Sequence, residues 1–174
     1  MALDLPWYKV RQDMVKLPNG KIMDDYMVSV RDDFAAVFPI VDNDKVIVVT
    51  QYKHGIQKIT TEFPAGFIEK GEDPADAARR KLLEETGHHA ENMTKLLTLA
   101  ENSTKNTNWI HIYLAKDAVK VSEQQLDKHG ETEIEVRIIA LTDLWAMIQN
   151  GEIEAAPMVA TALHALVHLG NFKP

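Results

Sequence analysis

The segment from Asp73 to Gly87 constrains the fold most strongly, because the sequence marks both ends of a helix there. The Asp73 side chain is suited to accept a hydrogen bond at a helix N-terminus, and Pro74 suits the first turn. Apolar residues recur inside the segment at helical spacing, and Gly87 is typical of the residue that stops a helix. Segments with the composition of strands lie on both sides. We therefore expect this helix to pack against strands that come both before and after it in the chain.

The remaining pattern predicts a mixed sheet rather than a strict alternation of strands and helices. Strands are expected at residues 5–17, 21–30, 34–41, 45–52 and 58–63 before the helix, and at 93–101, 109–116 and 133–140 after it. Turns at residues 18–21 and 42–44 join the first four strands into two hairpins. Further helices are expected from Thr142, as N-cap, through Gln149 and over residues 155–169, with a loop at 122–130. This pattern predicts an α/β (α+β) fold in which helices cover a mixed sheet.

The composition fits one soluble globular domain and argues against several other classes of protein. The 174 residues suffice for a single domain with a sizeable core. The chain has no cysteine, which excludes disulfides and thiolate metal sites and fits a cytoplasmic protein. No apolar run is long enough for a membrane span, and residues 1–6 do not resemble a secretory signal. The formal net charge of −7 argues against binding to a nucleic-acid duplex, but not against a phosphorylated small molecule bound through a divalent cation.

Two adjacent carboxylates give the predicted helix a chemical use. Residues three and four apart share a helix face, so we expect Lys81, Glu84, Glu85 and His88 to lie together, close to the glycine turn at residues 64–66. Arg80 precedes Glu84 by one turn and can pair with it. Magnesium prefers hard oxygen ligands and keeps several waters, so such a pair can hold it while substrate phosphates complete the shell. Taken alone, a Glu-Glu pair has another interpretation, which is a solvated helix face.

The wider spacing of residues 66–88 resembles the Nudix box. The matching positions are Gly66, Glu72, Arg80, Leu82, Glu84, Glu85 and Gly87. Two positions depart, because Lys81 stands where the family has a glutamate and His88 where it has an aliphatic residue. The resemblance implies a Nudix α/β/α sandwich, with the box as a loop-helix-loop. For Lys81 three outcomes stay open: catalysis with fewer metals, replacement by another carboxylate, or weakened or lost activity.

Flanking segments narrow the resemblance to ADP-ribose pyrophosphatases and nucleoside-diphosphate-sugar hydrolases. Those segments are 49–53 (VTQYK), 61–66 (TEFPAG) and 151–156 (GEIEAA). The resemblance implies magnesium-dependent hydrolysis of the diphosphate bond of a nucleoside diphosphate linked to another moiety, such as ADP-ribose or a nucleotide sugar. Mn²⁺ is the alternative cofactor. The resemblance also implies a homodimer formed through an N-terminal hairpin, residues 1–30, ahead of a Nudix domain at 31–174. The alternatives are a catalytically weakened nucleotide-binding domain and a hydrolase of nucleoside triphosphates or dinucleoside polyphosphates.

The same resemblance implies roles for individual residues. Metal ligands are expected from the Ala65 carbonyl and from the side chains of Glu84, Glu85 and Glu72. Catalytic roles are expected for Glu84, Glu85, Arg80, which orients the carboxylates, and the loop glutamates Glu131 and Glu133. Substrate contacts are expected from Lys53 to a phosphate, Glu62 to base or ribose, and Trp7 and Tyr8 by stacking. A plain strand-end charge for Glu62, and core or dimer packing for the two aromatic residues, are the other interpretations.

Overall fold

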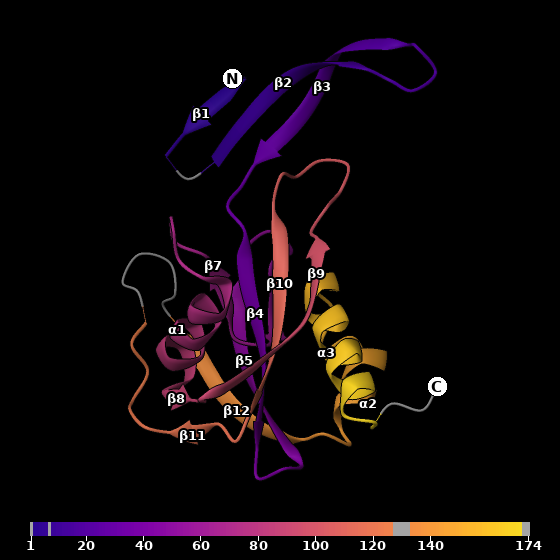
Figure 1. Ribbon diagram of the computed structural model, residues 1–174. Coiled ribbons are helices and arrows are strands. Elements are labelled where there is room, and N and C mark those ends of the chain that lie inside the picture. Colours follow the sequence, from indigo (N-terminus) through magenta and orange to yellow (C-terminus); the bar gives the residue numbers. More distant parts are fainter. Residues whose placement is uncertain (1, 7, 127–132, 172–174) are drawn as a thin grey trace.

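The N-terminal strands form a small sheet that stands apart from the main body (Figure 1). The computed structural model describes residues 2–6, 8–126 and 133–171. Within them, strands β1 (Leu3–Leu5), β2 (Tyr8–Lys16) and β3 (Ile22–Val30) pair in the order β1-β2-β3. The prediction of one strand over residues 5–17 is wrong, since Leu5 pairs with Tyr8 across a reversal at Pro6. Proline lacks an N–H for the ladder and fixes its own φ, so it suits a turn better than a strand interior.

The main sheet is mixed, as predicted. It contains seven strands within the described residues, in the order β12-β5-β4-β10-β9, with β6 on β5 and β7 on β4. The only parallel pair among them is β10 with β4. Their bounds are β4 Phe34–Val41, β5 Lys45–Lys53, β6 Lys58–Glu62, β7 Ala65–Phe67, β9 Asn92–Ala100, β10 Trp109–Lys116 and β12 Ile134–Ala140. A separate pair joins β8 (His88–His89) to β11 (Val119–Lys120), and neither of these strands was predicted.

The sheet opens between β4 and β5, and this opening determines where the glycine turn lies. The two strands pair only next to their turn, at Ile40 with Val46 and at Val41 with Lys45. Beyond that point β5 pairs with β6, and β4 pairs with β7. The chain from β6 to β7 therefore enters between the two strands, and Gly66 comes to lie opposite Ala35.

Helices cover both faces of the sheet, which confirms the predicted α/β/α sandwich (Figure 1). Helix α1 (Pro74–Thr86) packs on one face, with Leu82 in a core that includes Val37 and Ile47. Helices α2 (Leu144–Gln149) and α3 (Ala156–His168) pack on the other, where the core includes Phe38 and Leu166. No helix in the described parts of the chain is long and apolar enough to span a bilayer.

One predicted helix cap is wrong. Asp143, not Thr142, occupies the N-cap position of α2, and no side chain caps that helix. The Thr142 hydroxyl instead lies 3.5 Å from a carboxylate oxygen of Asp143. With only six residues, α2 is held mainly by burial of Leu144 and Met147.

The loop between β9 and β10 fixes the N-terminal sheet to the body. Ser29 of β3 donates its N–H to the carbonyl of Lys105 at 2.7 Å, and Thr107 donates its N–H back to the carbonyl of Ser29 at 3.1 Å. The Tyr26 hydroxyl also donates to the carbonyl of Thr104 at 2.7 Å. These contacts make the polar loop a bridge between the two parts of the molecule.

Candidate active site

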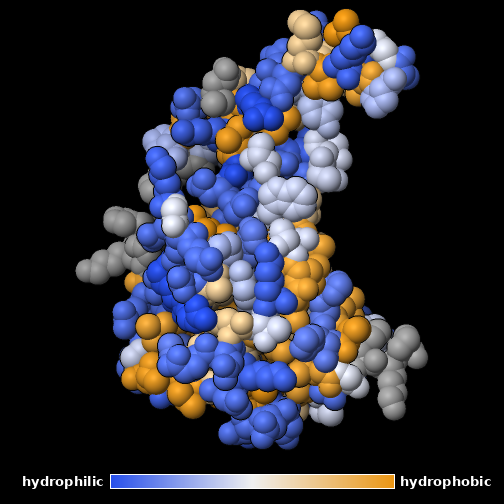
Figure 2. All heavy atoms as spheres, viewed as in Figure 1, coloured by the Kyte–Doolittle hydropathy of each residue, from blue (hydrophilic) through white to orange (hydrophobic). Residues whose placement is uncertain are grey.

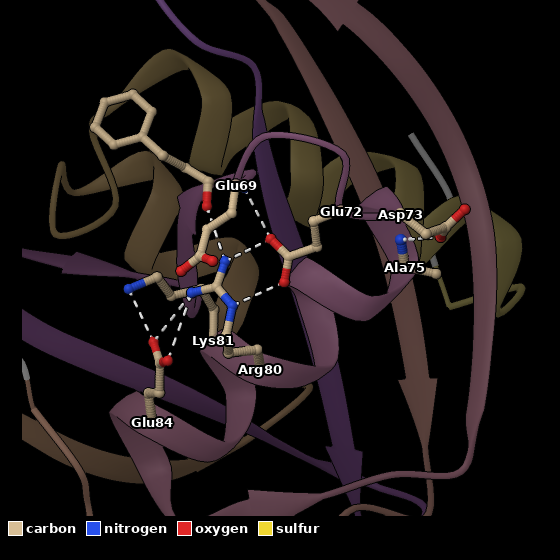
Figure 3. Close-up of polar contacts among 8 residues, drawn as sticks. Glu69, Glu72, Asp73, Ala75, Arg80, Lys81 and Glu84 are labelled. Atoms are coloured by element: carbon tan, nitrogen blue, oxygen red, sulfur yellow. Dashed lines mark hydrogen bonds and ion pairs between the residues drawn. The ribbon is translucent and has the colours of Figure 1, made fainter.

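Helix α1 begins and ends where the sequence predicts. The Asp73 carboxylate accepts the N–H of Ala75 at 2.8 Å, and Pro74 occupies the first turn (Figure 3). Gly87 has φ 70° and donates its N–H to the carbonyl of Leu83 at 2.8 Å. A left-handed φ favours glycine, so the stop is fixed by backbone geometry. Leu82 and its apolar neighbours anchor the inner face, which leaves the charged side to face the preceding loop.

Arg80 fastens that loop to the helix (Figure 3). Its Nε and Nη2 donate to the two carboxylate oxygens of Glu72 at 2.8 and 2.7 Å, and Nη2 also donates to the carbonyl of Phe67 at 3.0 Å. Its Nη1 lies 3.4 Å from the Glu84 carboxylate, which confirms the expected pairing one turn apart. Hydrogen bonding between the two side chains lowers the pKa of Glu72 and raises the pKa of Arg80. Because both Glu72 oxygens bind Arg80, the structure favours a supporting role for Glu72 over a metal contact.

Lys81 brings a second cation to Glu84. Its Nζ lies 3.0 Å from a Glu84 carboxylate oxygen, and its side chain is only 12% exposed. The Lys81 stem crosses directly over Gly66, where a Cβ atom would stand 2.1 Å from the Lys81 Cε. The carboxylate of Glu84 is thus shared between Arg80 and Lys81.

Glu85 lies deeper than Glu84, with 4% of its surface exposed. Burying a carboxylate is costly unless cations, hydrogen-bond donors or a metal offset its charge. The Glu85 carbonyl accepts a hydrogen bond from Nε2 of Gln124 at 2.6 Å, and the same nitrogen donates to the carbonyl of Ile134 at 3.0 Å. Gln124 therefore ties the end of α1 to the start of β12. Sequence reasoning missed it, since a lone glutamine in a polar segment carries no pattern.

One residue expected on this helix lies elsewhere. His88 follows the Gly87 stop and lies in β8 rather than on α1, so its expected place on the Glu84 face is wrong. Its ring is buried, and Nδ1 lies 2.9 Å from the Thr86 carbonyl. Burial lowers the pKa of His88, and a hydrogen bond with Thr86 opposes the shift only in part. Glu131 lies outside the described residues, as does Trp7.

The oxygen donors at the helix fit a magnesium ion that takes only a few of its ligands from the protein. Glu84 and Glu85 offer carboxylates, and Ala65 offers a carbonyl from β7 beside Gly66. No cage of three acidic, histidine or cysteine side chains exists among the described residues. Magnesium often takes only one or two carboxylates and completes its shell with water and phosphate oxygens. This donor set fits that pattern of binding, whereas it would not make a closed structural site.

Among the expected substrate residues, Lys53 and Glu62 lie together, and Tyr8 lies apart from them in the wall of a cavity. Lys53 and Glu62 pair with each other, with Nζ 3.0 Å from the Glu62 carboxylate, and Lys53 also donates to the Gln51 side chain at 2.6 Å. A cavity of about 390 Å³ includes Glu133 in its lining, with Thr50, Gln51, Tyr52, Ile59, Ile134 and Glu135. Tyr8 lines another, of about 430 Å³, together with Pro6, Lys9, Val30, Arg31, Asp32 and Phe67. The second cavity brings Tyr8 and Phe67, the last residue of β7, into one wall.

Comparison with known proteins agrees with this geometry. The family model described as NUDIX domain matches residues 31–162, which include both β7 and α1. The chain belongs to the NUDIX family. Family membership confirms the expectation of an enzyme, a Nudix hydrolase, whose loop and helix at residues 66–88 carry the family's motif.

Individual relatives give the family assignment more detail. An ADP-ribose pyrophosphatase of Bacillus subtilis (strain 168) is 31% identical over 139 residues, which are 80% of this chain and 74% of that protein. A methanol dehydrogenase activator of Bacillus methanolicus is 38% identical over 112 residues, 64% of this chain and 60% of that protein. A crystal structure of an ADP compounds hydrolase superposes with a TM-score of 0.83 at 22% identity, covering 98% of this chain and 92% of that one. The structural likeness shows that this Nudix chain shares the fold, including the N-terminal sheet.

Proposed function

We propose that this Nudix enzyme uses magnesium to hydrolyse the diphosphate bond of a nucleoside diphosphate linked to another group, such as ADP-ribose or a nucleotide sugar. The observation that carries the proposal is the array in which Arg80 holds Glu72 and Glu84 beside the buried Glu85. Relatives named ADP-ribose pyrophosphatase and ADP-sugar pyrophosphatase support the substrate class.

The reaction needs a water to form a bond to one phosphorus while the bridging oxygen leaves with the other phosphate. The products are a nucleoside monophosphate and a sugar phosphate. Magnesium held by Glu84, Glu85 and the Ala65 carbonyl, with Mn²⁺ as a substitute, would neutralise phosphate charge and lower the pKa of a bound water. Arg80 keeps the Glu84 carboxylate and the loop in place. Glu133, or Glu131 in the neighbouring segment, is proposed as the base that accepts the proton of the attacking water.

The cavity beside Phe67 is proposed to hold the nucleotide base. Its lining offers the exposed ring of Tyr8 and the ring of Phe67, with the guanidinium of Arg31 5.9 Å from the Phe67 ring centroid. Aromatic rings and a guanidinium plane are surfaces on which bases stack. Trp7, next to Tyr8 in sequence, is proposed to contribute in the same way.

Lys53 and Glu62 are proposed to contact the rest of the nucleotide. The Lys53 ammonium is 40% exposed at the side chain, so a phosphate can approach it while Glu62 stays paired. The second Glu62 oxygen accepts the Thr60 hydroxyl at 3.0 Å, which fixes the carboxylate for a hydrogen bond from a ribose.

A homodimer is part of the proposal. Three exposed apolar side chains share one face of the N-terminal sheet by strand register: Leu3, Leu5 and Met27. Apolar colour appears on this sheet at the upper end of the molecule in Figure 2. An exposed apolar face of this kind is typical of an interaction surface. Light scattering should find dimers for the wild type and for Val167→Lys, an exposed apolar site on α3, but monomers for Met27→Lys.

We also propose a cytoplasmic location, supported by the lack of cysteine.

One screen tests the enzymatic proposal. Nucleotide sugars, ADP-ribose, nucleoside triphosphates and dinucleoside polyphosphates are each incubated with magnesium and the wild type, Lys81→Glu, Glu85→Gln or Glu91→Gln. Glu91 is an exposed carboxylate outside the cluster and serves as the matched control. We expect the wild type to hydrolyse nucleoside-diphosphate sugars. Glu85→Gln should lose at least about a hundredfold in rate, since a metal ligand contributes several kcal/mol. Glu91→Gln should keep the wild-type rate.

The alternatives have their own outcomes in this screen. Wild type that hydrolyses none of these compounds refutes the proposal. Full activity in Glu85→Gln shows that the metal site is wrong. Preference for triphosphates or dinucleoside polyphosphates favours the other class of hydrolase. Activity that appears only in Lys81→Glu favours a weakened, nucleotide-binding domain.

A further inference from the structure

Residues 121–125, the capping segment, close the C-terminal end of α1. The last four carbonyls of a helix have no partner within the helix itself, and in α1 they include those of Glu84 and Glu85. The Gln125 N–H donates to the Glu84 carbonyl at 2.8 Å, and Nε2 of Gln124 donates to the Glu85 carbonyl at 2.6 Å. The capping segment therefore holds the backbone of both residues whose carboxylates are proposed to bind metal.

The capping segment fits closely against the helix end. Val121 and Ser122 donate their N–H groups to the Gly87 carbonyl at 2.9 and 3.1 Å. A Cβ atom at Gly87 would stand 2.1 Å from the carbonyl oxygen of Ser122, so a larger residue would push the segment away. Gly87 is thus required both by the left-handed φ that ends the helix and by this close approach.

Gln124 also joins the capping segment to the main sheet. A carboxamide nitrogen carries two hydrogens, and Nε2 of Gln124 donates both to the Glu85 carbonyl at 2.6 Å and to the Ile134 carbonyl at 3.0 Å. Ile134 is buried at the start of β12 and pairs with Gln51 of β5. One side chain therefore ties the last turn of α1 to a strand of the main sheet.

We propose that Gln124 is a positioning residue of the metal site, which holds the last turn of α1 against β12 so that the carboxylates of Glu84 and Glu85 bind the same divalent ion. The role rests on the proposed function, since it concerns the metal ligands proposed there. Helix ends fray, so ligands on a last turn need support from outside the helix. Partners that orient metal ligands commonly contribute roughly 10–100-fold to metal affinity or activity.

Metal affinity gives the first test, and it needs no turnover. Free Mn²⁺ is followed by electron paramagnetic resonance as it is added to the wild type and to each variant. Gln124→Met has no donor and should raise the Kd for Mn²⁺ about tenfold or more. Gln124→Asn keeps a carboxamide that is one methylene too short to reach both carbonyls, so it should raise the Kd as well. An unchanged Kd in both variants overturns the proposal.

Two control variants accompany these measurements. Gln125→Met changes an exposed side chain and keeps the backbone bond to Glu84, so it should change the Kd by less than about twofold. Met147→Ala opens a gap in the core on the other face of the sheet and should destabilise the protein at least as much as Gln124→Met. At a temperature where circular dichroism shows every variant folded, Met147→Ala should bind Mn²⁺ like the wild type. An equal loss of affinity in Met147→Ala would mean that Gln124 only stabilises the fold, which overturns the proposal.

Steady-state kinetics gives the second test. Gln124 is not among the residues that line the two cavities described above, so it should act on the metal ligands and not on the nucleotide. At saturating magnesium, Gln124→Met should lower kcat about tenfold or more and change KM by less than about twofold. A raised KM with an unchanged kcat would overturn the positioning role.

The two proposals fail in different ways. If Gln124→Met loses Mn²⁺ affinity but the wild type hydrolyses no nucleoside-diphosphate sugar, the role of Gln124 stands and the proposed function falls. If the wild type binds Mn²⁺ and hydrolyses these compounds while Gln124→Met matches it in both, the proposed function stands and the role of Gln124 falls. A wild type that binds no Mn²⁺ overturns the role of Gln124 together with the proposed metal site.

Discussion

Gly66→Ala should destabilise the protein only because Lys81 is present. The backbone of Gly66 lies in β7 opposite Ala35 and is not among the positive-φ glycines, so alanine can adopt it. The added Cβ would stand 2.1 Å from Cε and 2.6 Å from Cδ of Lys81. Carbon atoms in contact prefer about 3.5–4.0 Å. The lysine stem must therefore move, and its ammonium must leave its position 3.0 Å from Glu84.

The size of the effect follows from two opposing terms. Overpacking a well-packed position costs about 1–3 kcal/mol. Replacing glycine by alanine at a compatible backbone gains about 0.4–1 kcal/mol through the unfolded chain. The net cost is about 0.5–2 kcal/mol, or a fall of roughly 1–8 °C in Tm for a chain of this size. In a Lys81→Ala background the obstacle is gone, so Gly66→Ala should be neutral or raise Tm by roughly 1–4 °C.

A double-mutant cycle measures this coupling. The wild type, both single variants and the double variant are unfolded by heat and by urea, with far-UV circular dichroism as the signal. The expected interaction energy is about 1–3 kcal/mol. Gly55→Ala is the matched control, because nothing lies within 4 Å of its added Cβ and its φ is not positive. Gly55→Ala should change the free energy of unfolding by the same amount in the wild type and in the Lys81→Ala background. The reasoning is refuted if Gly66→Ala costs the same in both backgrounds.

Three further changes test other contacts of the site. Burial lowers the pKa of His88 below its ordinary 6.5, so the fold favours the neutral ring and loses stability as the pH falls from there through the lowered pKa. His88→Leu should therefore flatten the pH dependence of urea unfolding between about pH 7 and 5, and an unchanged slope would contradict this. Gln124→Met should cost about 1–3 kcal/mol because two carbonyls lose their donor, whereas Gln125→Met, at an exposed position, should cost under about 0.5 kcal/mol. Equal costs would show that the carboxamide contacts are unimportant. Glu72→Gln should cost about 1.5–3 kcal/mol at neutral pH by removing the charged acceptor of Arg80. That cost should shrink in acid, as the pH falls below 4.5 and through the lowered pKa of Glu72, which unfolding at both pH values measures.

The sequence predicts most of the fold because its elements carry local signals. Helix α1 has a capping Asp73 and a stopping Gly87, and the predicted bounds of β4, β5 and β6 agree with the structure to within a residue. The short strands β7, β8 and β11 were not predicted, because a strand of two or three residues shows no periodicity in the sequence. Their pairing depends on where the rest of the sheet leaves open edges, which only the tertiary structure decides.

The contacts of the site likewise divide into those that local spacing predicts and those that depend on the tertiary structure. Spacing on a helix was enough to predict that Arg80 would meet Glu84, since residues four apart share a face. It could not predict that Arg80 would also bind both oxygens of Glu72, because the loop must first fold back on the helix. Gln124 reaches Glu85 from 39 positions along the chain, a distance over which a single sequence carries no signal.

The contact between Gly66 and Lys81 makes two positions of the motif depend on each other. In this chain the glycine leaves space for a long stem, and the stem delivers a cation to Glu84. Changing Lys81 to glutamate would therefore not simply restore a family pattern. The shorter side chain would leave a gap over Gly66, and Glu84 would lose one of its two cations while gaining a like charge one turn away. We expect Lys81→Glu to be less stable than the wild type in EDTA and to regain stability as Mn²⁺ is added, because ions that bind only the folded state stabilise it. Equal stability of the two proteins without metal would mean that the Lys81 contact contributes little to the fold.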